Sequence, residues 1–69
     1  MKLIVNGVSR EIISETNSPT LEELLKQIKY HPQLVVVELN GIIINPKNLK
    51  NQIIKDGDIL EIVTIVGGG

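Results

Sequence analysis

Residues 34–44, LVVVELNGIII, contain two apolar runs on either side of Asn40-Gly41. An Asn-Gly pair between such runs predicts a β-hairpin, because both residues tolerate the positive φ angles of a type I′ turn. Pairing across this two-residue loop sets Glu38 opposite Ile43, and the charge of Glu38 marks the solvent face. The sequence therefore predicts that Ile43 points outward. The set predicted to point inward is Val35, Val37, Leu39, Ile42 and Ile44.

A second hairpin is predicted at the start of the chain. Residues 2–5 and 8–13 flank Asn6-Gly7, which again favours a two-residue turn. Such a turn sets Arg10 opposite Leu3, on the face that Leu3 and Val5 should bury. We therefore expect the second strand to lie at a sheet edge or to carry a bulge, and its register stays open.

The hydrophobic period changes between the two hairpins and predicts one helix. Thr20 and Glu23 match a capping box, with Thr20 as the N-cap. Pro32 disfavours helical geometry at His31, so the helix must end before it. These limits predict a helix of about three turns. Its apolar stripe follows the i, i+3, i+4, i+7 spacing and consists of Leu21, Leu24, Leu25 and Ile28.

The last third of the chain adds an irregular polar stretch over residues 46–51, in which a short helical turn is the other reading, then a turn at residues 55–58 and a long strand over residues 59–66. Residues 55–58, KDGD, lack the spacing of a calcium loop beyond Asp58, so a turn is favoured over a metal site. One helix can cover only one face of a sheet. The element order β-β-α-β-β-β thus predicts an α+β fold, with the helix packed on one face of a mixed four- to five-stranded sheet. With the last strand central and parallel to the first, this is the β-grasp, or ubiquitin-like, fold.

Composition excludes several functional classes. The 69 residues include no Cys and one His, and the net charge is −1. Disulfides, thiolate metal sites and a cysteine nucleophile are therefore excluded, and there is no basic footprint for nucleic acid. No apolar run reaches the ~20 residues that span a bilayer. We expect no metal site, no catalytic residue, no membrane or nucleic-acid partner, and a cytoplasmic location. The abundance of Ile, Asn and Lys suits an AT-rich genome, so the plastid stroma is the other compartment considered.

The chain ends in Gly67-Gly68-Gly69, directly after the last strand. Such an end can be a frayed terminus or a cloning remnant, but we favour a chemical role. Three glycines extend up to ~10 Å without side chains, enough to enter a narrow active site on another protein. Adenylation by ATP would activate the Gly69 carboxylate, and a sulfur donor replacing AMP would give a thiocarboxylate. We expect a domain of residues 1–66 and a flexible tail of residues 67–69.

Strand alternation predicts a docking surface beside this tail. The charge of Glu61 indicates that Leu60 and Ile62 face the core, which turns Val63 and Ile65 outward. Exposed aliphatic side chains next to a reactive terminus would suit a partner protein. The alternative is a strand end that the chain itself covers. The predicted docking patch consists of Ile43, Val63, Ile65 and Val66.

Six segments together resemble one protein family. They are VNG at 5–7, TLEELL at 20–25, VVVELNG at 35–41, INPK at 44–47, DGDILEIV at 56–63 and VGGG at 66–69. The chain resembles the sulfur carriers of thiamine biosynthesis, the ThiS family of the β-grasp superfamily. No single segment is specific, but the set spans nearly the whole chain in the right order. The family often has Val-Pro-Arg where this chain has Asn45-Pro46-Lys47.

The resemblance implies a stoichiometric sulfur donor and not an enzyme. An E1-like adenylyltransferase of the ThiF type would activate Gly69 with ATP and magnesium, while Gly67 and Gly68 thread into its active site. Sulfur from cysteine would arrive through a cysteine desulfurase. A thiazole synthase of the ThiG type would then accept the sulfur for the thiazole moiety of thiamine. The chain itself would bind no cofactor.

Three alternatives remain for the function. The molybdopterin-synthase small subunit is another sulfur carrier of this fold, with a diglycine end. A ubiquitin-like modifier would be conjugated to lysines instead of carrying sulfur. A β-grasp interaction module would have an inert tail.

Overall fold

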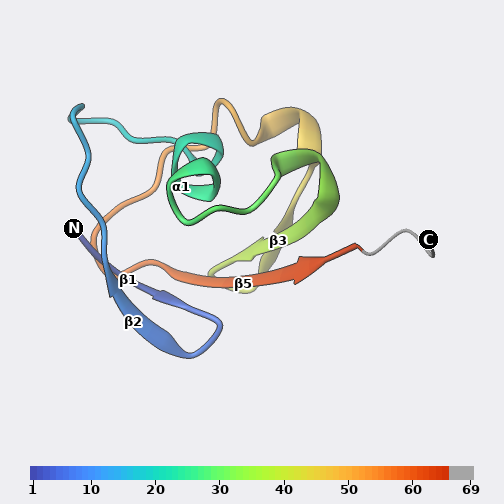
Figure 1. Cartoon of the computed structure of the whole chain (residues 1–69), viewed down its shortest axis with the longest axis horizontal. Coiled ribbons are helices and arrows are strands. Elements are labelled where there is room, and N and C mark those ends of the chain that lie inside the picture. The colour runs from blue at the N-terminus through green and yellow to red at the C-terminus, as the bar shows by residue number, and fades with distance from the viewer. Residues whose placement is uncertain (66–69) are drawn as a thin grey trace.

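The sheet has five strands in the order β2-β1-β5-β3-β4, with the last strand in sequence at its centre. A computed structural model describes residues 1–65 and places the helix α1 (Leu21–Gln27) across one face of this sheet (Figure 1). β5 runs parallel to β1 and antiparallel to β3. The predicted α+β, β-grasp arrangement is thereby confirmed. The strands are β1 Lys2–Val5, β2 Val8–Glu11, β3 Val35–Leu39, β4 Ile42–Ile44 and β5 Ile59–Thr64.

The first hairpin has the predicted turn. Asn6 and Gly7 have φ angles of 50° and 80°, as a type I′ turn requires. Leu3 lies opposite Arg10, and the register runs from Lys2–Glu11 to Val5–Val8 without interruption. β2 is an edge strand, and all its residues are exposed. The edge alternative is therefore correct and no bulge is needed, because Arg10 reaches water on the face where Leu3 is buried.

The second hairpin also has the predicted turn and register, with one error in the predicted faces. Asn40 and Gly41 have φ angles of 50° and 87°, and Glu38 lies opposite Ile43. Ile43 is 68% exposed, as predicted, but Ile42 is 67% exposed and not buried. β4 is the other edge of the sheet. Ile42 is on the helix side at the tip of the hairpin, beyond the area that the core covers, whereas Ile44 packs partly against the core.

The helix begins where predicted. Thr20 is the N-cap, and its Oγ1 accepts a hydrogen bond from the Glu23 N–H at 3.3 Å. The Thr20 hydroxyl also donates to Glu23 Oε1 at 3.3 Å. Leu21, Leu24 and Leu25 are buried and Ile28 packs partly against the core, so the predicted apolar stripe is the buried stripe.

The helix is shorter than predicted. α1 has 7 residues, about two turns and not three. Lys29 adopts a left-handed φ of 67°, and its N–H donates to Lys26 O at 3.1 Å. The Tyr30 N–H donates to Leu25 O at 2.8 Å. These two bonds form a Schellman motif, which ends the helix before Pro32 can act on it.

The core contains residues that the sequence did not predict. Ile12, Leu49 and Ile54 are buried but lie outside the regular apolar patterns. Leu49 follows a short 3₁₀ helix, Pro46–Asn48, which agrees with the short helical turn considered for residues 46–51. A second 3₁₀ helix, Pro32–Leu34, precedes β3. The buried apolar residues are Leu3, Val5, Ile12, Leu21, Leu24, Leu25, Val35, Val37, Leu39, Leu49, Ile54, Leu60 and Ile62.

Residues 55–58 form a turn, as predicted. Gly57 has a φ of 89°, and the Asp58 N–H donates to Lys55 O at 3.1 Å. Asp58 is buried, and its carboxylate accepts bonds from the Lys55 N–H at 2.8 Å and from Asn40 Nδ2 at 3.0 Å. Its oxygens therefore hold the turn against the second hairpin. Residues 1–65 contain no group of three or more His, Cys, Asp or Glu arranged to hold a metal.

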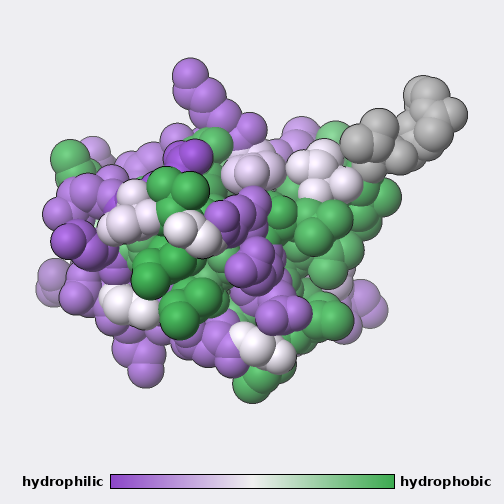
Figure 2. Space-filling model, turned by 90° about the horizontal axis from the view of Figure 1, so that it is seen from below, coloured by the Kyte–Doolittle hydropathy of each residue, from purple (hydrophilic) through white to green (hydrophobic). Residues whose placement is uncertain are grey.

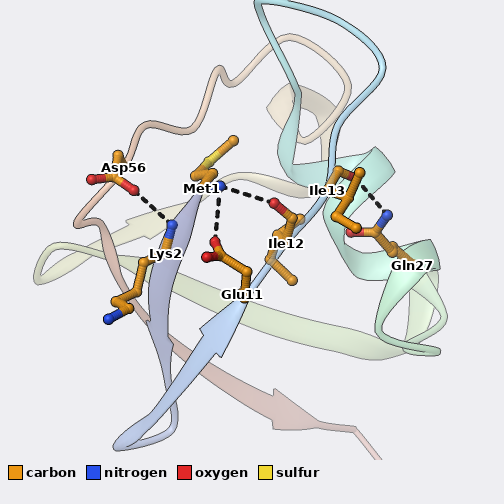
Figure 3. A network of polar contacts seen from close by, with 7 residues as sticks. All are labelled: Met1, Lys2, Glu11, Ile12, Ile13, Gln27 and Asp56. Carbon is orange, nitrogen blue, oxygen red and sulfur yellow. Dashed lines mark hydrogen bonds and ion pairs between the residues drawn. The ribbon is translucent and has the colours of Figure 1, made fainter.

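Polar contacts join the start of β1 to the end of β2 and to the 55–58 turn, and join the segment after β2 to α1 (Figure 3). They are the Met1 amine to Glu11 Oε2 at 2.9 Å and to Ile12 O at 3.1 Å, the Lys2 N–H to Asp56 Oδ1 at 2.6 Å, and Gln27 Nε2 to Ile13 O at 2.7 Å. They join the first hairpin to the 55–58 turn and to α1. Within the part of the chain described, no helix is long and apolar enough to span a membrane.

The end of α1 gives a first test. We expect Lys29→Gly to stabilise the protein by about 0.5–1 kcal/mol, because glycine adopts the left-handed conformation without the steric cost of a Cβ. The measurement is the midpoint of urea unfolding. Lys29→Ala is the control, since it removes the charge but keeps the Cβ. An equal gain in both variants would show that the charge, and not the backbone conformation, sets the effect.

Candidate functional site

β5 divides its side chains between the core and the solvent, as predicted. Leu60 and Ile62 are 0% and 5% exposed, whereas Val63 and Ile65 are 63% and 50% exposed. Glu61, which lies between Leu60 and Ile62, is also exposed. Val66 and Gly67–Gly69, the other predicted site residues, lie outside the described residues. The exposed side chains of Val63 and Ile65 are thus the described part of the site nearest to the terminus.

A residue of β3 connects Val63 to Ile43. Val36 is 39% exposed and lies directly opposite Val63 in the β3–β5 pair. Ile43, on β4, lies opposite Glu38, on β3. Ile43 is therefore a diagonal neighbour of Val36 on the same face of the sheet. The sequence prediction missed Val36, although its position between the inward Val35 and Val37 signals an outward side chain. We call Val36, Ile43, Val63 and Ile65 the aliphatic patch.

Two like charges lie beside this patch. Glu38 and Glu61 are directly opposite each other on β3 and β5. The ion pairs among residues 1–65 are Met1–Glu11 and Glu22–Lys26, so neither of the two glutamates takes part in one. Like charges directly opposite across two strands are destabilising. The centre of the sheet therefore carries two unneutralised carboxylates at a cost in stability.

A second aliphatic pair lies on the far side of the glutamates. Ile4 on β1 is opposite Ile59 on β5, and these residues are 37% and 48% exposed. Figure 2 looks onto the face of the sheet that the helix leaves uncovered and shows hydrophobic areas separated by hydrophilic side chains. A partner that covers this face must supply cations or hydrogen-bond donors at its centre, because burial of unpaired carboxylates is costly.

Comparison with known proteins gives a match along nearly the whole chain. The model of the ThiS family matches residues 3–69. The crystal structure of a thiamine biosynthesis protein (ThiS) from Geobacter metallireducens is 34% identical, with a TM-score of 0.79 and 100% of both chains covered. A solution structure of a thiamine biosynthesis protein from the same organism is 34% identical, with a TM-score of 0.76, covering 100% of this chain and 88% of the other.

Three curated proteins are also similar. An uncharacterized protein ycf40 of Trieres chinensis is 44% identical over 54 residues, which are 78% of this chain and 74% of that protein. An uncharacterized protein ycf40 of Pyropia yezoensis is 38% identical over 50 residues, 72% of this chain and 70% of that one. A thiazole synthase of Paramagnetospirillum magneticum is 38% identical over 69 residues, which are all of this chain and 20% of that protein.

The opposed glutamates give a second test. We expect Glu61→Gln to stabilise the fold by about 0.2–1 kcal/mol, because it removes the repulsion with Glu38. The gain should shrink as salt is added. Thermal unfolding at low and high salt measures it. Glu15→Gln, an exposed loop substitution, is the control for the change in net charge, and an equal gain there would contradict a local repulsion.

Proposed function

This chain belongs to the ThiS family, and from that membership we propose that it is a sulfur carrier of thiamine biosynthesis and not an enzyme. The observation that carries the proposal is the extent of the family match, which runs from residue 3 through Gly69 and so includes the glycine-rich end. The sequence has no Cys on which a side chain could carry sulfur. The terminal carboxylate is the group left for that task.

The proposed chemistry has two steps at Gly69. A carboxylate oxygen attacks the α-phosphorus of ATP, and pyrophosphate leaves. A sulfide ion then attacks the acyl carbon, AMP leaves, and the product is a C-terminal thiocarboxylate. The ATP and magnesium belong to a ThiF-type adenylyltransferase. A cysteine desulfurase takes the sulfur from cysteine as a persulfide, and a thiol reduces this persulfide to the sulfide used here. Gly67 and Gly68 have no side chains that would hinder entry into the partner's active site.

We propose a ThiG-type thiazole synthase as the sulfur acceptor. A segment similar to this entire chain forms 20% of the thiazole synthase of Paramagnetospirillum magneticum. Fusion of a carrier to the enzyme that uses its sulfur would keep donor and acceptor together, and this supports the thiazole route over the molybdopterin route.

The location of the protein in the cell stays a prediction, in the cytoplasm or the plastid stroma.

We also propose that the aliphatic patch, with Val66, docks on these partners. Val63 and Ile65 are exposed in the last described residues before the terminus. Burial of their apolar surface by a docked partner would contribute about 25 cal/mol of binding free energy per Å². The adjacent pair Glu38 and Glu61 would select a partner surface that carries Lys or Arg.

The chemistry is tested by intact mass. The chain is incubated with a ThiF-type adenylyltransferase, ATP and sulfide, and then with a thiol-alkylating reagent. We expect a single adduct that maps to Gly69, because only a thiocarboxylate offers a reactive sulfur in a chain without Cys. Alkylation also distinguishes sulfur transfer from oxidation of Met1, whose added mass is nearly equal.

A variant that lacks Gly68 and Gly69 is the control for this assay and should give no adduct. An unmodified full-length chain, with an adenylyltransferase active on its own carrier, would contradict the proposal and favour an inert-tailed interaction module. An isopeptide adduct on lysines would instead indicate a ubiquitin-like modifier. Sulfur transfer in molybdopterin synthesis, and not to thiazole synthase, would identify the other carrier class.

The docking patch is tested by a matched pair of substitutions. We expect Val63→Lys to raise the KM for the carrier about tenfold in the adenylation assay, because it places a charge within an apolar contact. Val8→Lys is the control. Val8 is a strand valine of similar exposure, 60% against 63%, but it lies on edge strand β2, on the helix side of the sheet. An equal KM for both variants would contradict docking at the patch.

A further inference from the structure

The C-terminal half of β5 loses one of its two neighbouring strands. On one side β3 pairs with β5 from Leu60 to Thr64. On the other side β1 pairs with β5 only at Ile59 and Leu60, because β1 ends at Val5 and turns away. Beyond Leu60, β5 has no strand on that side.

The side chain of Asn6 takes the place of the missing strand. The Ile62 N–H donates to Asn6 Oδ1 at 2.7 Å, and Asn6 Nδ2 donates to Ile62 O at 3.1 Å. The Asn6 N–H also donates to Leu60 O at 2.9 Å. The Asn6 side-chain bonds are partly buried. One amide therefore satisfies both backbone groups of Ile62, as a residue of a paired strand would.

We propose that Asn6 is a positioning residue for sulfur transfer. By holding Ile62 in the sheet, it sets the place and direction in which Val63 and Ile65 continue toward the terminus. Without these bonds, the end of β5 would be held on the β3 side only, and a partner would have to order it on binding. That ordering costs affinity. The inference rests on the proposed function, because it assumes that a partner takes up the terminus.

The structure supplies a matched control at the other end of β5. Asn40 has the same φ of 50° and is likewise followed by glycine in a type I′ turn. Its N–H donates to Ile59 O at 2.8 Å, and its Oδ1 accepts the Ile59 N–H at 2.9 Å. Asn40 thus holds Ile59 at the start of β5 as Asn6 holds Ile62. The Asn40 Nδ2 also donates to Asp58 Oδ1 at 3.0 Å, so the control variant loses at least as many bonds.

The experiment compares Asn6→Gly with Asn40→Gly. Glycine keeps the positive φ of each turn and removes only the side-chain amide. We expect both variants to unfold at lower urea concentration than the wild type. We expect Asn6→Gly to raise the carrier KM about three- to tenfold in ATP–pyrophosphate exchange, with kcat near wild type, and Asn40→Gly to change KM less than about twofold.

Hydrogen exchange provides a readout that does not depend on a partner. The Ile62 amide should exchange faster in Asn6→Gly, while the Leu60 amide stays protected. Asn6→Asp keeps the acceptor for the Ile62 N–H but replaces the donor with an oxygen that faces the Ile62 carbonyl, so its KM should also rise above that of the wild type. This variant also serves if the glycine variant fails to fold.

Three results would overturn the inference. One is an unchanged KM in both Asn6 variants, with a wild-type chain that is adenylated. Another is an equal rise in KM for Asn6→Gly and Asn40→Gly, which would trace the effect to lost stability. A wild-type chain that is not adenylated at all would refute the proposed function itself, and with it the role of Asn6.

Discussion

The alternation of side chains along β5 is the constraint on which the rest of the molecule depends. β1 and β3 both pair with β5, and the edge strands join the sheet only through them. Leu60 and Ile62 fill the core, while Glu61 and Val63 between and after them form the outer face. The core and the exposed outer face therefore use alternate residues of one strand. A slip of one residue would bury the charge and expose the core, so the register of β5 is held by both requirements at once.

The outer face combines two features that the fold alone does not require. Its aliphatic residues would favour face-to-face association if nothing opposed them. Glu38 and Glu61, which face each other across β3 and β5, disfavour this association, because two copies meeting through this face would bring four carboxylates together. The same charges favour a basic partner. The small loss of stability that they cause is consistent with a surface used for recognition.

Local chemistry explains what the sequence could predict. Asn-Gly pairs set both turns and the register of the second hairpin, while the register of the first hairpin stayed open. Thr20 set the start of the helix, and the charge of Glu61 set the faces of β5. The errors arose where the outcome depends on the finished fold and not on the local sequence pattern. Ile42 has an inward direction, but only the finished core shows that nothing covers it. The left-handed Lys29 ended the helix early, and lysine carries no signal for that conformation.

The two turn asparagines show why part of the site could not be predicted. The sequence accounts for Asn6 by its positive φ alone, and a turn needs nothing more from it. Its bonds to Ile62 span 56 residues and exist only because β1 and β5 run parallel and β1 is the shorter. Residues 1–65 include one α-helix, of 7 residues, so few contacts can replace a missing strand. A side-chain amide, which carries one donor and one acceptor group like a peptide unit, can do so. The residue that best makes the turn is thus also the residue best able to hold the strand beside it.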